Sequence, residues 1–323
     1  MNSGGAPNGV LGENESPQAR QWAVVLAGGS GSRLEPLTSR YMGGHVPKQY
    51  CSLFGDRSLL GDALERAQQF TARERIVTIV ARNHRPCWAR DLPGLDTRTV
   101  IVQPLNRGTA AGVLLPLLEI ATRDPAAHVT LLPADHFFTH EDLLVRAIRD
   151  AQRIVARSTD RLVLVGMKPE DAESDYGWIL PAGHVDGGLR VRRFVEKPTR
   201  AEAARLLRQG AVWNGFYLTA SVQALLGLFM ERAPGLLAAL RAADAQQGLG
   251  EIYESMPPSD FCRDLLAGYE EHLDLVVAPE CGWTDLGTPA RVTRCARSYE
   301  QRLGTPGQGL AAPALRTWAA HGE

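Results

Sequence analysis

Near its start the chain passes from an apolar run into a glycine-rich turn: Val24-Val25-Leu26-Ala27-Gly28-Gly29-Ser30-Gly31-Ser32-Arg33-Leu34. The apolar residues predict a buried strand, and the glycines predict a turn at its carboxyl end. Because glycine has no Cβ and tolerates positive φ, successive backbone N–H groups in such a turn can converge on an anion, and a phosphate is expected. Arg33 and Lys48 would supply positive charge to a polyphosphate.

Two common glycine motifs do not fit this turn. A P-loop closes on Gly-Lys-Ser/Thr, whereas this turn closes on Ser32-Arg33. A dinucleotide fingerprint fits Gly29 and Gly31, but Leu34 stands where the third glycine belongs and no acidic residue ends the second strand. An ordinary strand-to-helix turn with two solvated cations is the remaining alternative.

Composition sets limits on the class of protein. The 323 residues, 44% of them hydrophobic, allow one large α/β domain or two modest ones. The 35 basic and 36 acidic residues give a net charge of −1, which argues against nucleic-acid and membrane-surface partners. Five cysteines without a Cys-x-x-Cys pair favour a reduced, cytoplasmic compartment and argue against structural zinc. Neither a membrane span nor a secretory leader is expected.

The first half of the chain alternates apolar strands with helical patterns. We expect strands at residues 24–27, 76–80, 100–102, 129–132 and 162–165. Such apolar strands are typical of a parallel sheet that helices cover on both faces. Ligands of these sheets collect beyond the carboxyl ends of the strands, where residues 28–33, 103–109 and Asp135 are expected. Thr139 and Asp142 predict a capping box for the helix that follows.

The pattern becomes more mixed after residue 175. Strands are expected at residues 176–180, 189–195, 212–218 and 273–277. We expect residues 1–20 to form a disordered tail and residues 21–300 to form the folded domain, in two parts, 21–166 and 167–300. Residues 301–323 are expected to form a flexible tail.

Six motifs follow one another between Trp22 and Ser298. They are the glycine loop with Pro47-Lys48, Pro133-Ala134-Asp135-His136, Tyr176-Gly177-Trp178-Ile179, Phe194-Val195-Glu196-Lys197-Pro198, Trp213-Asn214-Gly215 and Gly282-Trp283-Thr284-Asp285-Leu286-Gly287. In this order they resemble the sugar-1-phosphate nucleotidyltransferases, most closely the mannose-1-phosphate guanylyltransferases without the isomerase-type domain. The resemblance implies an α/β, Rossmann-like, mostly parallel central sheet with helices on both faces (GT-A-like) and a mixed sugar-binding subregion. It also implies that residues 21–166 form a nucleotide-binding half and residues 167–300 a sugar-binding half.

The resemblance also implies a reaction and a set of site residues. A nucleotidyl group would pass from a nucleoside triphosphate to a sugar 1-phosphate with release of pyrophosphate, mainly through positioning and charge neutralisation. The implied catalytic residues are Arg33, Lys48, Asp135 and Lys197, and Asp135 and Asp285 would bind Mg²⁺. The implied nucleotide-binding residues are Leu26, Ala27, Gly28, Gly29, Ser30, Gly31, Ser32, Arg33, Lys48, Gln103, Arg107, Gly108, Thr109, Ala110 and Asp135. The implied sugar-binding residues are Tyr176, Gly177, Glu196, Lys197 and Asn214, and His136 is expected to orient or pack.

The first expectation for the substrates is GTP and mannose 1-phosphate, which would give GDP-mannose. Gln103 and Gly108 stand where the guanylyltransferases have glutamate and asparagine, so UTP or dTTP with another hexose or heptose 1-phosphate stays an alternative. A non-catalytic nucleotide-binding regulatory subunit is the third alternative. The resemblance leaves a homodimer open.

Overall fold

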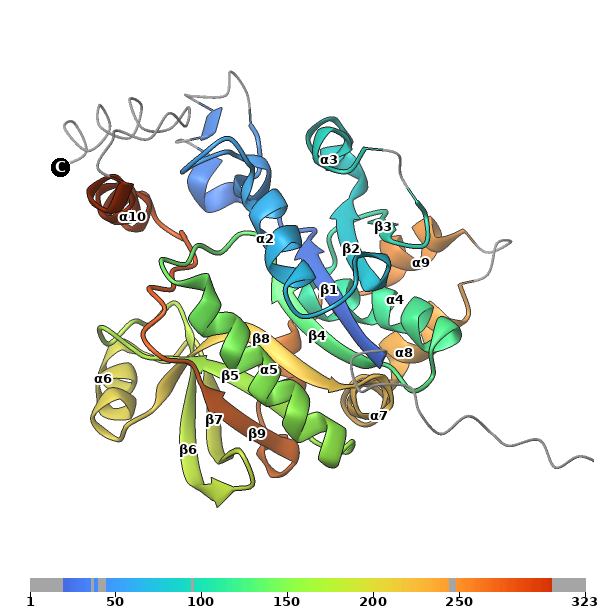
Figure 1. The fold of residues 1–323 in the computed structure, drawn as a ribbon. Coiled ribbons are helices and arrows are strands. Elements are labelled where there is room, and N and C mark those ends of the chain that lie inside the picture. The colour runs from blue at the N-terminus through green and yellow to red at the C-terminus, as the bar shows by residue number, and fades with distance from the viewer. Residues whose placement is uncertain (1–19, 36–37, 40–44, 94–95, 244–247, 304–323) are drawn as a thin grey trace, which may run out of the picture.

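The strands of the described residues belong to one sheet. The computed structural model describes residues 20–35, 38–39, 45–93, 96–243 and 248–303. In this part nine strands pair in the order β3-β2-β1-β4-β8-β5-β9-β7-β6 (Figure 1). Their bounds are β1 Gln21–Ala27, β2 Ile76–Ala81, β3 Val100–Gln103, β4 His128–Pro133, β5 Leu162–Met167, β6 Gly177–Val185, β7 Gly188–Glu196, β8 Val212–Ser221 and β9 Leu273–Val277.

The first four strands form the predicted parallel sheet. β1 pairs in parallel with β2 and β4, so that Leu26 stands between Ile79 and Pro133. β8 then enters antiparallel between β4 and β5, and it separates β5 from the four parallel strands. The strand predicted at residues 162–165 is present as β5, which pairs in parallel with β9. Its place beyond β8 depends on tertiary pairing that local apolarity does not encode.

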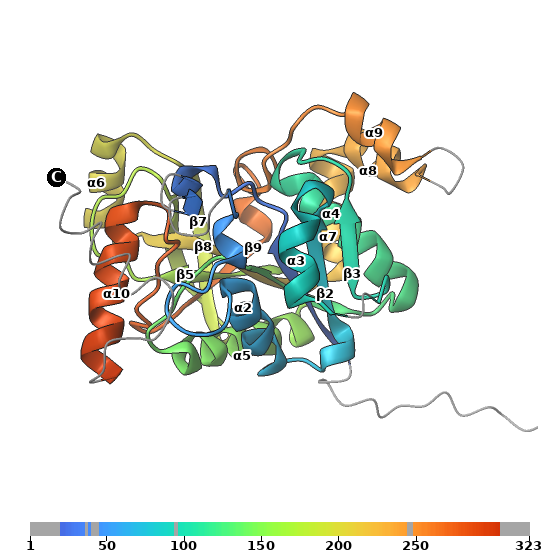
Figure 2. The same ribbon diagram turned by 90° about the horizontal axis from the view of Figure 1, so that it is seen from above.

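Helices cover both faces of the sheet, as predicted (Figure 2). Alternate residues of β1 face opposite layers: Ala23 and Val25 pack with α2 and α5, whereas Trp22 and Val24 pack with α4 and α7. The helices are α2 Leu59–Gln68, α3 Arg85–Asp91, α4 Gly108–Arg123, α5 Glu141–Arg157, α6 Arg200–Arg208, α7 Val222–Arg232, α8 Pro234–Arg241, α9 Leu249–Ser255 and α10 Pro289–Leu303. Short 3₁₀ turns are η2 Ser32–Leu34, η3 Lys48–Tyr50, η4 Arg73–Arg75, η5 Arg82–His84 and η7 Glu270–His272, and η6 (Phe261–Leu266) is a π-helix.

Two helix starts show where local signals hold and where they fail. The Ser58 side chain accepts a hydrogen bond from Gly61 N and caps α2. The Thr139–Asp142 capping box is wrong, because α5 begins at Glu141 after His140 without a side-chain cap bond. The N–H groups of Thr139 and His140 instead donate to the Cys281 carbonyl, so a distant segment determines how the chain enters α5.

Several expectations concern the chain ends and boundaries. The predicted tails lie almost wholly in residues 1–19 and 304–323, outside the described residues. The predicted boundary at residue 166 falls inside β5, and the sheet continues across it. Within the described residues no helix combines the length and apolarity needed to cross a bilayer.

Candidate active site

The glycine turn after β1 is held from behind by η3. Gln49 Nε2 donates to the carbonyls of Ala27 (3.0 Å) and Gly29 (2.8 Å), and the Tyr50 hydroxyl also donates to Ala27 (2.9 Å). Gly31 has a φ of 65°, a conformation that favours glycine. The predicted turn is therefore present, and its conformation is fixed by side chains about twenty residues later in the chain.

A cavity of about 340 Å³ lies beyond the carboxyl ends of β1, β3 and β4. Seven residues predicted to bind nucleotide line it: Leu26, Gly28, Gly29, Gln103, Gly108, Thr109 and Asp135. Phe216 and Asp260 also line it, although neither was predicted from the sequence. They come from β8 and from the segment before η6, and no local motif links those segments to the glycine turn.

Gln103 places a side-chain amide inside this cavity. The residue is 2% exposed, its Nε2 donates to the Gly28 carbonyl at 3.4 Å, and its Oε1 has no hydrogen-bond partner. A Cβ at Gly28 would lie 2.4 Å from Gln103 Nε2, so glycine is what lets the amide approach. A buried acceptor without a partner carries a free-energy cost that a bound donor would relieve.

The 106–110 loop is joined to the segment before η6. Gly108 has a φ of 85°, and a Cβ there would lie 2.2 Å from the Ser259 carbonyl oxygen, which explains glycine at this position. Arg107 donates to the carbonyls of Tyr253 and Glu254, so its side chain turns toward α9 and is absent from the cavity lining. The structure thus gives Arg107 a role in holding the loop.

Lys48 contacts both residues that are predicted to bind metal, Asp135 and Asp285. Its Nζ lies 3.0 Å from Asp135 Oδ2 and donates to the main-chain carbonyl of Asp285. Lys48 is 6% exposed, and a buried ammonium needs such partners. Asp135 and Asp285 therefore meet at one ammonium although they are far apart in the sequence. The side chain of Arg33 lies outside the described part of the structure.

The Asp285 carboxylate is held in one orientation. Its Oδ1 accepts from the Tyr176 hydroxyl (2.8 Å), the Gly287 N–H (2.9 Å) and Arg291 Nη1 (3.1 Å). Burial alone would raise the pKa of this carboxyl, but Lys48, His136 and Arg291 bring the pKa below its usual value. Asp285 is therefore ionised at neutral pH.

His136 is an orienting residue in this geometry. Its Nδ1 accepts from Trp283 Nε1 at 3.1 Å, and its Nε2 lies 3.8 Å from Asp135 Oδ1. Burial lowers its pKa to about 4, so the ring is neutral and the Trp283 bond assigns its proton to Nε2. That proton faces Asp135.

Oxygen donors suited to a hard divalent cation are thus present in the two carboxylates. No cluster of three or more His, Cys, Asp or Glu side chains suitable for a metal occurs within the described residues. Mg²⁺ needs no such cluster, because it retains waters and takes phosphate oxygens from its substrates. Asp135 and Asp285 therefore fit the implied ion.

A second buried acceptor lies on the predicted sugar side. Glu196 Oε2 has no hydrogen-bond partner, and a Cβ at Gly177 would lie 2.6 Å from this oxygen. Burial, with the nearby Asp260 charge, raises the pKa of Glu196 to about 7. Lys197 Nζ lies 3.8 Å from Glu196 Oε1 on a largely exposed side chain. Asn214 accepts from Phe216 N and donates to Cys262 Sγ.

Strained backbone gathers around the same site. In the described part of the chain the non-glycine residues with positive φ are Lys197 (48°), Phe216 (61°) and Leu286 (50°). They adjoin Glu196, the nucleotide cavity and Asp285 respectively. Each such conformation costs about 1–3 kcal/mol and persists only where the surroundings enforce it. The strain therefore marks the segments that place the site residues.

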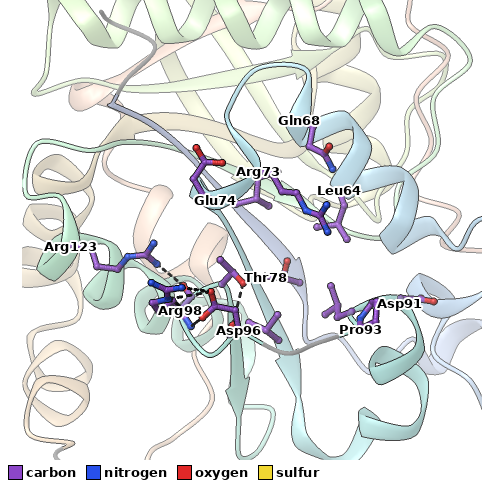
Figure 3. A pocket seen from close by; sticks show the side chains of 14 residues that line it. Leu64, Gln68, Arg73, Glu74, Thr78, Asp91, Pro93, Asp96, Arg98 and Arg123 are labelled. Atoms are coloured by element: carbon purple, nitrogen blue, oxygen red, sulfur yellow. Dashed lines mark hydrogen bonds and ion pairs between the residues drawn. The ribbon is translucent and has the colours of Figure 1, made fainter. Parts of the chain in front are cut away.

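A larger cavity, about 470 Å³, lies elsewhere, near the start of β2 (Figure 3). Arg98 pairs with Asp96 at 2.9 Å in its wall, and Arg123 donates to the Arg98 carbonyl. Its lining contains none of the residues predicted for the site. Ligands of parallel sheets bind at the opposite strand ends, so this cavity is not the candidate active site.

In this α/β fold a glycine-lined cavity beyond parallel strands is bounded by Asp135, and Lys48 joins Asp135 to the main chain of Asp285. Residues 22–302 match the nucleotidyl transferase family, and the chain belongs to that family. The chain is 30% identical over 278 residues to an Escherichia coli mannose-1-phosphate guanylyltransferase. It is 31% identical over 287 residues to the xanthan biosynthesis protein XanB of Xanthomonas campestris pv. campestris. Each match covers 82% of this chain.

A solved structure supports the fold assignment. A Thermus thermophilus structure described as a mannose-1-phosphate geranyltransferase superposes with a TM-score of 0.75 at 29% identity, covering 87% of this chain and 80% of that one. The chain spans 58% of the E. coli relative and 57% of XanB. The predicted Rossmann-like, GT-A-like class is confirmed, as is the predicted membership of the nucleotidyl transferase family.

Proposed function

We propose that this chain transfers a guanylyl group from GTP to mannose 1-phosphate, forming GDP-mannose and pyrophosphate. The observation that carries the proposal is the pair of partnerless buried acceptors, Gln103 Oε1 and Glu196 Oε2, in the predicted nucleotide and sugar regions. Lys48 pairs with the Asp135 carboxylate and donates to the main-chain carbonyl of Asp285, which supports a common site for these two residues. The names of the E. coli and T. thermophilus relatives favour mannose 1-phosphate as the acceptor.

The chemistry needs little covalent help from the protein. A phosphate oxygen of the sugar 1-phosphate attacks the α-phosphorus, the bond from that phosphorus to the bridging oxygen breaks, and pyrophosphate leaves with the electron pair. The attacking oxygen is already anionic, so no general base is required. In this proposal the glycine turn and Arg33 hold the triphosphate, Lys48 balances the carboxylates, and Lys197 orients the sugar phosphate.

Asp135 and Asp285 would hold Mg²⁺. When bound, the ion supplies positive charge to the phosphate oxygens of the substrates. Members of the nucleotidyl transferase family generally use a divalent metal, which supports an ion at this place. Magnesium as the particular ion, a cytoplasmic location and a homodimer stay predictions from the sequence.

Base choice depends on Gln103. Guanine presents two neighbouring N–H donors, N1–H and the 2-amino group, whereas uracil and thymine present one N–H beside a carbonyl. The partnerless Gln103 Oε1 can accept from either kind of base. UTP or dTTP with another sugar 1-phosphate is therefore the second candidate, favoured by an amide where the guanylyltransferases have a carboxylate.

A substrate screen tests the proposal. Pyrophosphate release is measured for GTP, ATP, UTP and dTTP against mannose, glucose and other hexose or heptose 1-phosphates, with Mg²⁺ and with EDTA. We expect the highest kcat/KM for GTP with mannose 1-phosphate and no turnover in EDTA. A clear preference for UTP or dTTP would transfer the proposal to the second candidate. Nucleotide binding without turnover for any pair would favour a regulatory subunit.

A further inference from the structure

One arginine outside the predicted motifs connects the two sides of the site. Arg291 lies in the first turn of α10, and its N–H donates to Thr288 Oγ1. It is 8% exposed, so its guanidinium has been taken out of water. A buried guanidinium is tolerated when its N–H groups are paired, and its choice of partners therefore carries information.

The partners of Arg291 come from two separate segments. Nη1 bonds Asp285 Oδ1 at 3.1 Å, and Nη2 pairs with Glu173 Oε2 at 2.9 Å. The guanidinium also lies over the Tyr176 ring, 4.5 Å from its centroid. The Tyr176 hydroxyl donates to the same Asp285 oxygen at 2.8 Å, which closes a ring of contacts. The segment before β6 and the carboxylate after β9 are thus joined through one cation.

We propose that Arg291 is a positioning residue that couples the sugar-binding segment at Tyr176 to the metal-binding carboxylate of Asp285. This inference rests on the proposed function. Arg291 does not line the nucleotide cavity, so it acts through the groups that it holds. With Arg291, Tyr176 and Gly287 all bound to Oδ1, Asp285 keeps one orientation before any ligand arrives. Such outer partners of metal ligands typically alter metal affinity about 10- to 100-fold.

Arg291→Met tests the coupling, because methionine keeps much of the aliphatic volume and removes the cation. We expect the Mg²⁺ activation constant to rise about tenfold and the KM for mannose 1-phosphate to rise several-fold. The KM for GTP should stay within about twofold, since Arg291 lies away from that cavity. Arg294→Met is the matched control: Arg294 stands one turn later, is exposed and pairs with Glu170 at 3.6 Å.

Three readouts separate positioning from a loss of general stability. Mn²⁺ is titrated into each protein with GDP-mannose present, and free Mn²⁺ is followed by its EPR signal; Arg291→Met should bind about tenfold more weakly than Arg294→Met. Added guanidinium or methylguanidinium should restore metal affinity to Arg291→Ala.

A double-mutant cycle of Arg291→Met with Glu173→Gln tests the link to the sugar side. The increases in the KM for mannose 1-phosphate should be less than additive. Thermal unfolding and circular dichroism check the fold, and Arg291→Lys replaces the methionine variant if that protein does not fold.

The outcomes are distinguishable. If the wild-type protein releases no pyrophosphate, the proposed function fails, and the Mn²⁺ titration without GDP-mannose still tests Arg291. Unchanged Mn²⁺ affinity and unchanged sugar-phosphate KM in folded Arg291→Met would overturn the positioning role. A fall in kcat alone, equal at all metal and substrate concentrations and without guanidinium rescue, would also overturn it.

Discussion

The nucleotide side and the sugar side of the site are built by different means. The nucleotide side is mostly backbone, a glycine turn beyond parallel strands whose carbonyls are bound by η3. The sugar side is mostly side chains, with one carboxylate oxygen of Glu196, Oε2, lacking a hydrogen-bond partner and a network of ion pairs at Arg291. Lys197 and Leu286 add strained backbone on that side.

This difference predicts how the two sides respond to change. A backbone cradle donates N–H groups whatever the side chains are, so it should be disturbed mainly by steric intrusion. The sugar side depends on individual charges, so single changes there should alter particular constants. Substitution should lower activity most at Asp135 and Asp285, the carboxylates placed between the two sides.

The largest effect is expected where the two sides meet. Asp135→Asn removes a charge without changing volume, and we expect kcat to fall on the order of 10³-fold, about 4 kcal/mol of transition-state stabilisation. Pyrophosphate release measures turnover, and circular dichroism checks that the fold is retained. Asp142→Asn, an exposed carboxylate paired with Arg146 at 2.6 Å, is the matched control. Near-normal turnover in Asp135→Asn would remove Asp135 from the metal site.

A smaller effect is expected on the sugar side. Lys197→Ala should raise the KM for mannose 1-phosphate about tenfold or somewhat more, because a charge-assisted bond to phosphate is lost, and leave the KM for GTP within about twofold. Lys168→Ala is the control, since Lys168 is an exposed lysine paired with Glu280. The reverse pattern, with GTP affected more, would reassign Lys197 to the nucleotide.

The sugar side should also respond to pH through Glu196, whose pKa is raised to about 7 by burial. Sugar hydroxyls donate stronger hydrogen bonds to the ionised carboxylate than to the protonated carboxyl. The affinity for mannose 1-phosphate should therefore fall several-fold from pH 8 to pH 6. The phosphate of mannose 1-phosphate titrates with either protein, so Glu196→Gln should keep that pH dependence and lose the additional part that comes from Glu196. If the wild-type dependence of affinity on pH is retained in Glu196→Gln, Glu196 is not its source.

The raised pKa of Glu196 also affects stability. The folded state binds more protons at this group than the unfolded state between the usual pKa of 4.5 and about 7, so the group's contribution to stability falls as pH rises through that window.

The smallest effect is expected in the glycine turn. Gly28→Ala places a Cβ 2.4 Å from Gln103 Nε2, and the amide must move; we expect the KM for GTP to rise about two- to fivefold, with mannose 1-phosphate unaffected. Gly29→Ala is a control within the same turn, because no atom lies within 4 Å of its added Cβ. Equal effects of the two changes would argue against Gln103 as a contact to the base.

The sequence was most informative where local pattern fixes local structure. The apolar run of β1, the turn at Gly28 and the parallel direction of β1, β2 and β4 were predicted from apolar runs and glycine chemistry. The insertion of β8 between β4 and β5 does not, because strand order is set by packing between distant segments. The same limit explains why the predicted capping box at Thr139 is absent. The N–H groups of Thr139 and His140 donate to the carbonyl of the distant Cys281.

The candidate site shows the same division. Gln103 and Asp135 follow strands and were predictable from where those strands end. Arg107 looked like a phosphate contact by charge and place, yet carbonyls of α9 bind its guanidinium. Arg291 and Asp260 could not have been identified, since each reaches the site from a helix start with no motif of its own.

One structure would test most directly the claim that a nucleotide cradle and a sugar pocket meet at two carboxylates. Crystals are soaked with GDP-mannose and Mg²⁺. We predict guanine within hydrogen-bond distance of Gln103 Oε1, a mannose hydroxyl on Glu196, and the metal ion bound by both Asp135 and Asp285. Product bound away from Gly28, or a metal ion that Asp285 does not ligate, would contradict the claim.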